Sequence, residues 1–241
     1  MLKQIEQIFK NHGVEPIGFA PFALVALPGK RLPFEGIQTV IIASFPYLPP
    51  QPYQPTNLCL YARLPDYHRV IKTILSPIVD ELEKAFPGHR FSPFADSSPV
   101  REVYAASLAG LGCIGKNGLL ITPKYGSFVF LGGLLTDLAI ESALCEPIQC
   151  RDCGRCFSAC PTGALSPAGL DRSKCLSAIT QKKGQLSEEE ERAIRKNGMV
   201  WGCDQCQLAC PLNRDTRPSS IREFTDNIRP SLSEADLDTD L

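Results

Sequence analysis

The sequence lacks three features that would point to other classes of protein. It has no uninterrupted apolar run of about 18 residues, so we expect no membrane-spanning helix. It has no excess of basic residues, since its formal net charge is −1, which is unusual for a free-standing nucleic-acid binder. No charged-then-apolar leader follows Met1, so we expect a cytoplasmic protein whose thiols stay reduced.

Cysteine, in contrast, is abundant, with 11 residues in a chain of 241. Seven of them form two arrays, Cys150-x2-Cys153-x2-Cys156-x3-Cys160-Pro161 and Cys203-x2-Cys206-x3-Cys210-Pro211. This spacing is typical of a pair of [4Fe-4S] clusters, because three closely spaced thiolates converge on one cluster and the cysteine before proline ligates the other.

The two arrays are one thiolate short, since each cluster takes four. Val200 stands where a cysteine would complete the second array, and Cys175 is the nearest candidate for the eighth ligand. Crossed ligation then divides the thiolates into two sets: Cys150, Cys153, Cys156 and Cys210; and Cys160, Cys175, Cys203 and Cys206. A disulfide framework needs an oxidising compartment, and zinc sites usually use separated Cys-x2-Cys pairs, so both alternatives are less favoured.

Residues 1–145 predict an N-terminal mixed α/β domain, of the α+β or α/β class, because strand-length apolar runs alternate with helical patterns. We expect helices at residues 2–12 and 65–86, with Pro77 kinking or splitting the second. Residues 119–122 and 127–135 predict a hairpin. Because strands alternate with helices, we expect a mixed α/β sheet.

Residues 146–214 predict a ferredoxin-like double-cluster domain, in which clusters substitute for a hydrophobic core. A capping box at Ser187–Glu190 predicts a helix that runs to about Asn197. Residues 215–241 contain few large apolar side chains, and we expect an acidic, poorly ordered tail.

The N-terminal domain also contains candidate site residues. Asp96, in FADSSP, follows a predicted strand, and the glycine-dense run AGLGCIGKNG carries Lys116 and Asn117 just beyond it. Taken alone, Asp96 is more often a helix N-cap than a catalytic acid, and the glycines can be ordinary turns. The run is no phosphate loop, because no Gly-Lys-Ser/Thr follows at the required distance.

A set of motifs in fixed order resembles epoxyqueuosine reductases, a family of cobalamin-dependent iron–sulfur enzymes related to reductive dehalogenases. The motifs run from about residue 15 to Asn213: Cys59-x7-Tyr67-His68, Asp96-Ser-Ser-Pro99, Gly110-Leu-Gly112-Cys-Ile-Gly115-Lys116-Asn117, Tyr125-Gly126-Ser127, Leu131-Gly132, Thr136-Asp137 and both cysteine arrays.

The resemblance implies a cofactor and a mechanism. Residues 1–145 would hold base-off cobalamin, and the clusters would pass electrons from an external flavodoxin- or ferredoxin-type donor to reduce cobalt to Co(I). Asp96 matches the family's proton donor for the epoxide oxygen, and Cys59 matches a cysteine that faces the cobalamin. The remaining implied contacts are His68, Lys116 and Asn117 in the corrin pocket, and Gly202 and Asp204 where the cluster domain meets the cofactor. Cys113 and Cys145 are interpreted as packing residues.

The chain departs from the family pattern in its length. Fewer than 30 residues follow Asn213, where the family continues with a helical-repeat domain that grips tRNA. The segment between Phe22 and Gln38 is also short. Three functions stay open: a reductase acting on epoxyqueuosine in tRNA or on a smaller related substrate, a cobalamin-free electron-transfer protein, and a corrinoid-reducing helper.

Overall fold

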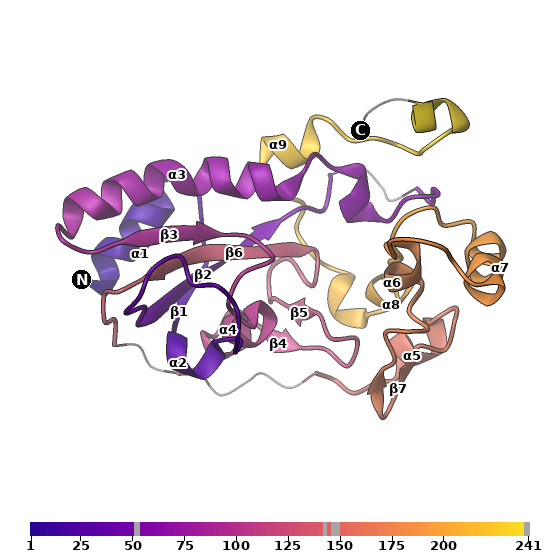
Figure 1. Ribbon diagram of the computed structural model, residues 1–241, viewed down its shortest axis with the longest axis horizontal. Helices are drawn as coiled ribbons and strands as arrows, with labels where there is room; N and C mark the ends of the chain where they lie inside the picture. The colour runs from indigo at the N-terminus through magenta and orange to yellow at the C-terminus, as the bar shows by residue number, and fades with distance from the viewer. Residues whose placement is uncertain (51–53, 142–143, 146–149, 239–241) are drawn as a thin grey trace. The chain divides into compact units, whose positions relative to one another are not determined.

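The computed structural model describes residues 1–50, 54–141, 144–145 and 150–238 (Figure 1). The chain forms two compact units that each combine separated segments. Unit 1 contains residues 1–46, 66–115 and 119–150, whereas unit 2 contains residues 47–65, 116–118 and 151–241. The expected single boundary between residues 145 and 146 adjoins residues 146–149, which lie outside the described part of the chain. The expected division also did not include residues 47–65 and 116–118 in the cysteine-rich unit.

Unit 1 is built on a four-stranded sheet with the order β1 (Ile17–Pro21), β2 (Thr39–Pro46), β6 (Val129–Thr136) and β3 (Phe91–Phe94). Every pairing in this sheet is antiparallel. The sheet is therefore antiparallel, within a fold that combines helices and strands as the sequence predicts. Strands β2 and β3 do run in the same direction, as an intervening helix leads one to expect, but β6 lies between them.

Helices cover both faces of this sheet (Figure 1). The long helix α3 (Tyr67–Ala85) packs on one face with α1 (Leu2–Asn11), and α4 (Glu102–Leu108) packs on the other with the short α2 (Phe22–Val25). In β6, a Cβ atom at Gly132 would lie 2.9 Å from a methyl carbon of Ile71 on α3, so glycine permits this close approach.

Two local predictions need correction. Pro77 does not split the second helix, because α3 runs continuously past it. Pro77 is exposed, and the buried residues on the opposite side of α3 offset the lost hydrogen bond; they are Ile71, Leu75, Ile78 and Leu82. The predicted hairpin is also wrong, since β5 (Leu120–Ile121) pairs with β4 (Cys113–Ile114), and β6 pairs with β2 and β3.

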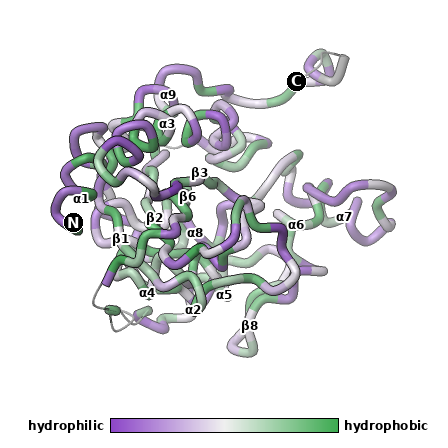
Figure 2. The backbone as a smooth tube through the Cα atoms, turned by 60° about the vertical axis from the view of Figure 1, so that its left-hand side comes forward, coloured by the Kyte–Doolittle hydropathy of each residue, from purple (hydrophilic) through white to green (hydrophobic). Residues whose placement is uncertain are grey.

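Unit 2 consists of short elements joined by loops. Its elements are η1 (Leu60–Arg63), α5 (Arg155–Ala159), β7 (Leu165–Ser166), β8 (Gly169–Leu170), α6 (Leu176–Thr180), α7 (Glu188–Asn197), α8 (Gln205–Leu208), η2 (Pro211–Asn213), α9 (Arg222–Thr225) and η3 (Glu234–Asp238). The predicted capping box of α7 is confirmed, with Gly198 ending the helix. Helix α7 has no buried residue and is mostly hydrophilic in Figure 2.

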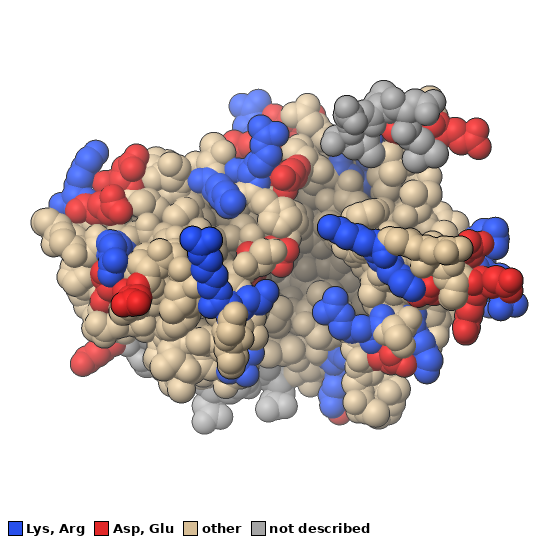
Figure 3. All heavy atoms as spheres, in the orientation of Figure 1, with Lys and Arg blue, Asp and Glu red and all other residues tan. Residues whose placement is uncertain are grey.

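The C-terminal segment is more ordered than we expected. The backbone N–H of Arg229 donates to the carbonyl of Arg63, and Asn57 exchanges two hydrogen bonds with the backbone of Leu232. Phe224 in α9 is fully buried. A lone aromatic side chain was too weak a signal to reveal this, and residues 239–241 lie outside the described part. Acidic and basic side chains are interspersed on the face shown in Figure 3.

Candidate functional site

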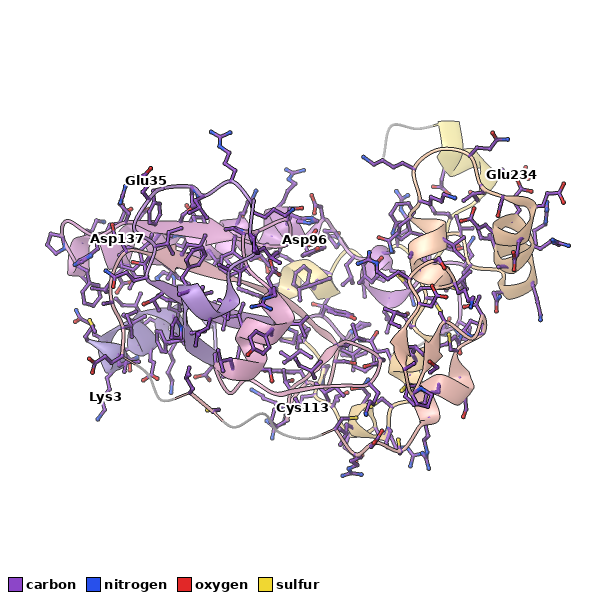
Figure 4. The ribbon with its side chains drawn as sticks, turned by 60° about the horizontal axis from the view of Figure 1, so that its bottom comes forward. Lys3, Glu35, Asp96, Cys113, Asp137 and Glu234 are labelled. Carbon is purple, nitrogen blue, oxygen red and sulfur yellow. The ribbon has the colours of Figure 1, made fainter. Side chains whose placement is uncertain are left out.

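Asp96 lies in a strained turn of unit 1, directly after β3. Both Asp96 (φ 53°) and Ser97 (φ 42°) adopt the left-handed conformation, which costs a non-glycine residue about 1–2 kcal/mol. The Asp96 side chain is 61% exposed, so its carboxylate is open to a ligand. Asp137 lies at the opposite end of β3, where it pairs with Arg90 (Figure 4). Backbone strain at an exposed acid is a feature that functional sites often show.

His68 is held between two carboxylates. Its Nε2 lies 3.5 Å from Oδ2 of Asp96, and its Nδ1 lies 2.7 Å from Oδ1 of Asp66. Asp66 also caps α3, since its side chain accepts the backbone N–H of His68 at 3.0 Å. The helix start therefore fixes the imidazole next to Asp96, and the three side chains form a chain of groups that can exchange a proton.

Tyr67 and Glu102 complete the surroundings of Asp96. The Tyr67 ring stacks on Phe130 with centroids 4.1 Å apart, and burial, together with the nearby Asp96 and Glu102 carboxylates, raises the pKa of its phenol. Burial raises the pKa of Glu102 to about 7, and the charge on Asp96 adds to this, although a hydrogen bond from Ser98 opposes it. No sequence motif indicated a chemical role for Glu102, which lies in the first turn of α4.

A second group of candidates lies in unit 2, around Cys59. This cysteine is fully buried, and its backbone N–H donates to the carbonyl of Trp201 at 2.9 Å. Gly202 has φ 72°, and any side chain there would collide with the Cys59 sulfur. The Asp204 carboxylate accepts the backbone N–H of Leu60 at 2.6 Å. Burial raises the pKa of Asp204 to about 6, and burial followed by the Asp204 charge raises the pKa of Cys59 to about 12.

Four thiols of unit 2 interact electrostatically. Burial raises the pKa of Cys206 to about 12, and the charges on three neighbouring thiolates add to this shift: Cys203, Cys175 and Cys160. Burial also raises the pKa of Cys203, with contributions from Asp204, Cys175 and Cys160. Burial raises the pKa of Cys160 as well, but backbone and hydroxyl hydrogen bonds around Thr162 outweigh it, so that its pKa is lowered. The structure thus brings Cys175 to the two arrays.

The remaining cysteines of the two arrays are located by the elements that contain or follow them. Cys156 lies in α5 and Cys210 precedes η2, and α5 packs against α8, which carries Cys206. Cys150 and Cys153 precede α5. Within the described residues, no three His, Cys, Asp or Glu side chains converge on the position of a single metal ion.

Lys116 and Asn117 belong to unit 2. Lys116 pairs with Asp152 at 3.5 Å. Asn117 is 7% exposed, and its nearby side-chain amide lowers the pKa of Cys206, against the larger effect of burial. The family resemblance implies that both residues line a corrin pocket. No sequence pattern indicated that Asn117 lies near a cysteine thiol.

Comparison with known proteins identifies both parts of the chain. Residues 149–213 match the family described as "4Fe-4S double cluster binding domain", and residues 30–97 match "Epoxyqueuosine reductase QueG, DUF1730". None of the helices in the described residues is both long and apolar enough to cross a membrane.

Individual relatives agree with these matches. An epoxyqueuosine reductase of Gloeobacter violaceus is 40% identical over 198 residues, which are 78% of this chain and 62% of the relative. A crystal structure of epoxyqueuosine reductase with an epoxyqueuosine-modified tRNA-Tyr stem loop has a TM-score of 0.76, with 27% identity over 95% of this chain and 69% of that one. A Bacillus subtilis structure, described with its catalytic aspartate loop swung out of the active site, has a TM-score of 0.74, with 25% identity and the same coverage.

More distant structures share the fold alone. A catabolic reductive dehalogenase has a TM-score of 0.56 at 15% identity, over 88% of this chain and 32% of that chain. The chain spans 54–64% of the length of the first four curated relatives it matches. The described structure is a mixed α/β fold with a double-cluster region, and the chain is similar to epoxyqueuosine reductases over most of its length.

Proposed function

We propose that this chain is a cobalamin-dependent reductase that removes the oxygen of an epoxide, with epoxyqueuosine in tRNA as the substrate. The observation that carries the proposal is the exposed carboxylate of Asp96, held in a strained turn with His68 3.5 Å away. Similarity to epoxyqueuosine reductases indicates the substrate class, since a crystal structure similar to this chain contains an epoxyqueuosine-modified tRNA stem loop.

The cysteines of the two arrays, together with Cys175, fit two [4Fe-4S] clusters. Thiolate is the ligand these clusters require, and the mutual effects on the pKa values of Cys160, Cys175, Cys203 and Cys206 indicate that these four thiols lie close together. Repulsion between neighbouring thiolates is removed when a cationic iron centre binds among them. We assign the remaining ligands, Cys150, Cys153, Cys156 and Cys210, to the other cluster.

The residues carried over from the family also fit a corrinoid. Its rim carries amide groups, and the side chains of His68 and Lys116 are 40% and 46% exposed and able to hydrogen-bond to such groups. Asp204 orders the backbone at Cys59 and Leu60, beside Gly202. We assign contacts with the corrinoid to His68, Lys116, Asn117 and these unit 2 residues. When bound, cobalamin supplies the nucleophile and the clusters supply single electrons.

The reaction needs two electrons and two protons, because both C–O bonds break, a carbon–carbon double bond forms and the oxygen leaves as water. Asp96 donates the proton that the oxygen takes up as its bond to carbon breaks. His68 then returns a proton to Asp96, and Asp66 holds the imidazole in place through Nδ1. An external one-electron donor is required.

The test is anaerobic reconstitution with iron, sulfide and hydroxocobalamin, followed by reaction with an epoxyqueuosine-bearing stem loop and nucleoside analysis. We expect about eight iron atoms and one corrinoid per chain, and conversion of the epoxide to the alkene. Iron without corrinoid would instead identify an electron-transfer protein. Corrinoid binding without conversion would exclude this substrate.

An Asp96→Asn variant tests the proton donor. We expect it to bind both cofactors and to reduce the corrinoid, but to lose about 100-fold or more of its turnover, as general acids typically contribute. Asp80→Asn is the matched control, because Asp80 is an exposed carboxylate on α3 of the same unit. Unchanged turnover in Asp96→Asn would exclude Asp96 as the proton donor.

A further inference from the structure

Glu102, at the start of α4, accepts a hydrogen bond from the turn that carries Asp96. Ser98 is 7% exposed, and its hydroxyl donates to Oε1 of Glu102 at 2.8 Å. The same hydroxyl oxygen accepts the backbone N–H of Val100 at 3.2 Å. The backbone N–H of Asp96 also lies close enough to the Glu102 carboxyl group to favour its ionised form. One carboxyl group therefore faces both ends of the Asp96–Ser98 turn.

The contact between Ser98 and Glu102 stabilises the strained backbone of the turn. Two successive left-handed residues, neither of them glycine, are unfavourable unless surrounding contacts hold them. A partly buried carboxyl group that accepts the Ser98 hydroxyl can supply such a contact, because an intramolecular hydrogen bond contributes about 1 kcal/mol. Without it, the turn relaxes to right-handed or extended backbone, and the Asp96 side chain leaves His68.

We propose that Glu102 is a positioning residue that holds the Asp96–Ser97–Ser98 turn in the conformation in which Asp96 faces His68. It acts through its acceptor oxygens rather than by touching the substrate. The consequence for catalysis rests on the proposed function, whereas the effect on the turn itself does not.

The test compares four variants of the cluster- and cobalamin-loaded protein: Glu102→Ala, Glu102→Gln, Ser98→Ala and the exposed control Glu83→Ala on α3. Hydrogen exchange of the peptide that spans the turn reports the conformation without any need for turnover. We expect faster exchange in Glu102→Ala and Ser98→Ala. We expect exchange close to that of the parent in Glu102→Gln, which keeps an acceptor oxygen, and in Glu83→Ala.

Turnover of the epoxide substrate is the second measurement. We expect Glu102→Ala to lower kcat by about 10- to 100-fold, the range that loss of hydrogen bonds to a charged group produces, with KM changed less than about twofold. Gln should restore kcat to within about threefold of the parent. The Ser98→Ala/Glu102→Ala double variant should be little worse than Glu102→Ala, since both remove the same contact.

The two proposals fail differently. Parental exchange at the turn in both Glu102→Ala and Ser98→Ala would overturn the positioning role, whatever the activity. Equal loss of kcat in Glu102→Gln and Glu102→Ala would also overturn it, because the charge would then matter rather than the acceptor. If Glu102→Ala and Ser98→Ala show faster exchange than the parent, but the parent does not convert the epoxide, the positioning role stands and only the proposed substrate is removed.

Discussion

Replacing Glu102 by glutamine should change how the stability of the protein depends on pH. Unfolded glutamate loses its proton near pH 4.5, whereas burial keeps Glu102 protonated until about pH 7 in the folded chain. Between these values the folded state holds a proton that the unfolded state lacks. Stability conferred by that proton is present below pH 4.5 and is lost as the pH rises through about 7.

The magnitude follows from the two pKa values. Their separation corresponds to about 3 kcal/mol of unfolding free energy, most of which is lost between pH 5 and pH 8. Glutamine keeps the shape and one acceptor oxygen but cannot ionise. The variant should therefore be more stable than the parent by about 3 kcal/mol at pH 8, and by less than about 1 kcal/mol at pH 5.

The assay is urea unfolding of the cluster-loaded protein under anaerobic conditions, followed by circular dichroism at several pH values from 5 to 8. The difference between variant and parent is the relevant quantity. It largely removes the contributions of the neighbouring groups that also titrate or carry charge: Asp96, His68 and Tyr67. Parallel pH curves, or a variant less stable than the parent at pH 8, would refute the reasoning.

Three further outcomes are expected in unit 2. Cys175→Ser should lower the bound iron from about eight atoms towards four, as measured by metal analysis, whereas Cys145→Ser should keep about eight. Asn117→Ala should lower the reduction potential of one cluster in a redox titration followed by electron paramagnetic resonance, because an amide group that favours negative charge on a ligand sulfur is lost. An unchanged potential would contradict this contact. Gly202→Ala should cost about 2 kcal/mol more in urea unfolding than Gly198→Ala: both glycines have positive φ, but only Gly202 lacks room for a methyl group.

Predictions from the sequence were most accurate where they depended on residues that lie close together along the chain. The capping box of α7 and the amphipathic face of α1 depend on residues within two turns of each other, and both helices formed as expected. Strand pairing depends instead on contacts between distant segments. No local pattern shows that Val129–Thr136 inserts between β2 and β3, so the hairpin was predicted incorrectly.

The candidate site shows the same division. Asp96 and His68 were chosen from motifs, and the structure brings their side chains together. Glu102 was missed, because its role depends on two left-handed residues that a sequence pattern does not reveal. The contact between Asn117 and Cys206 was missed for a related reason, since 89 positions along the chain separate the two residues.

The interleaved composition of unit 2 constrains how the protein is made. Residues 47–65 leave the ribosome long before their hydrogen-bonding partners near Trp201 and Leu232 have been synthesised. The thiol of Cys59 is therefore exposed during translation, and the cysteine-rich region cannot finish folding until residues as far as Leu232 have left the ribosome. Loading with iron and sulfide should accordingly follow synthesis rather than accompany it. A fragment cut out as an independent ferredoxin would lack the segment on which Trp201 and Gly202 rest.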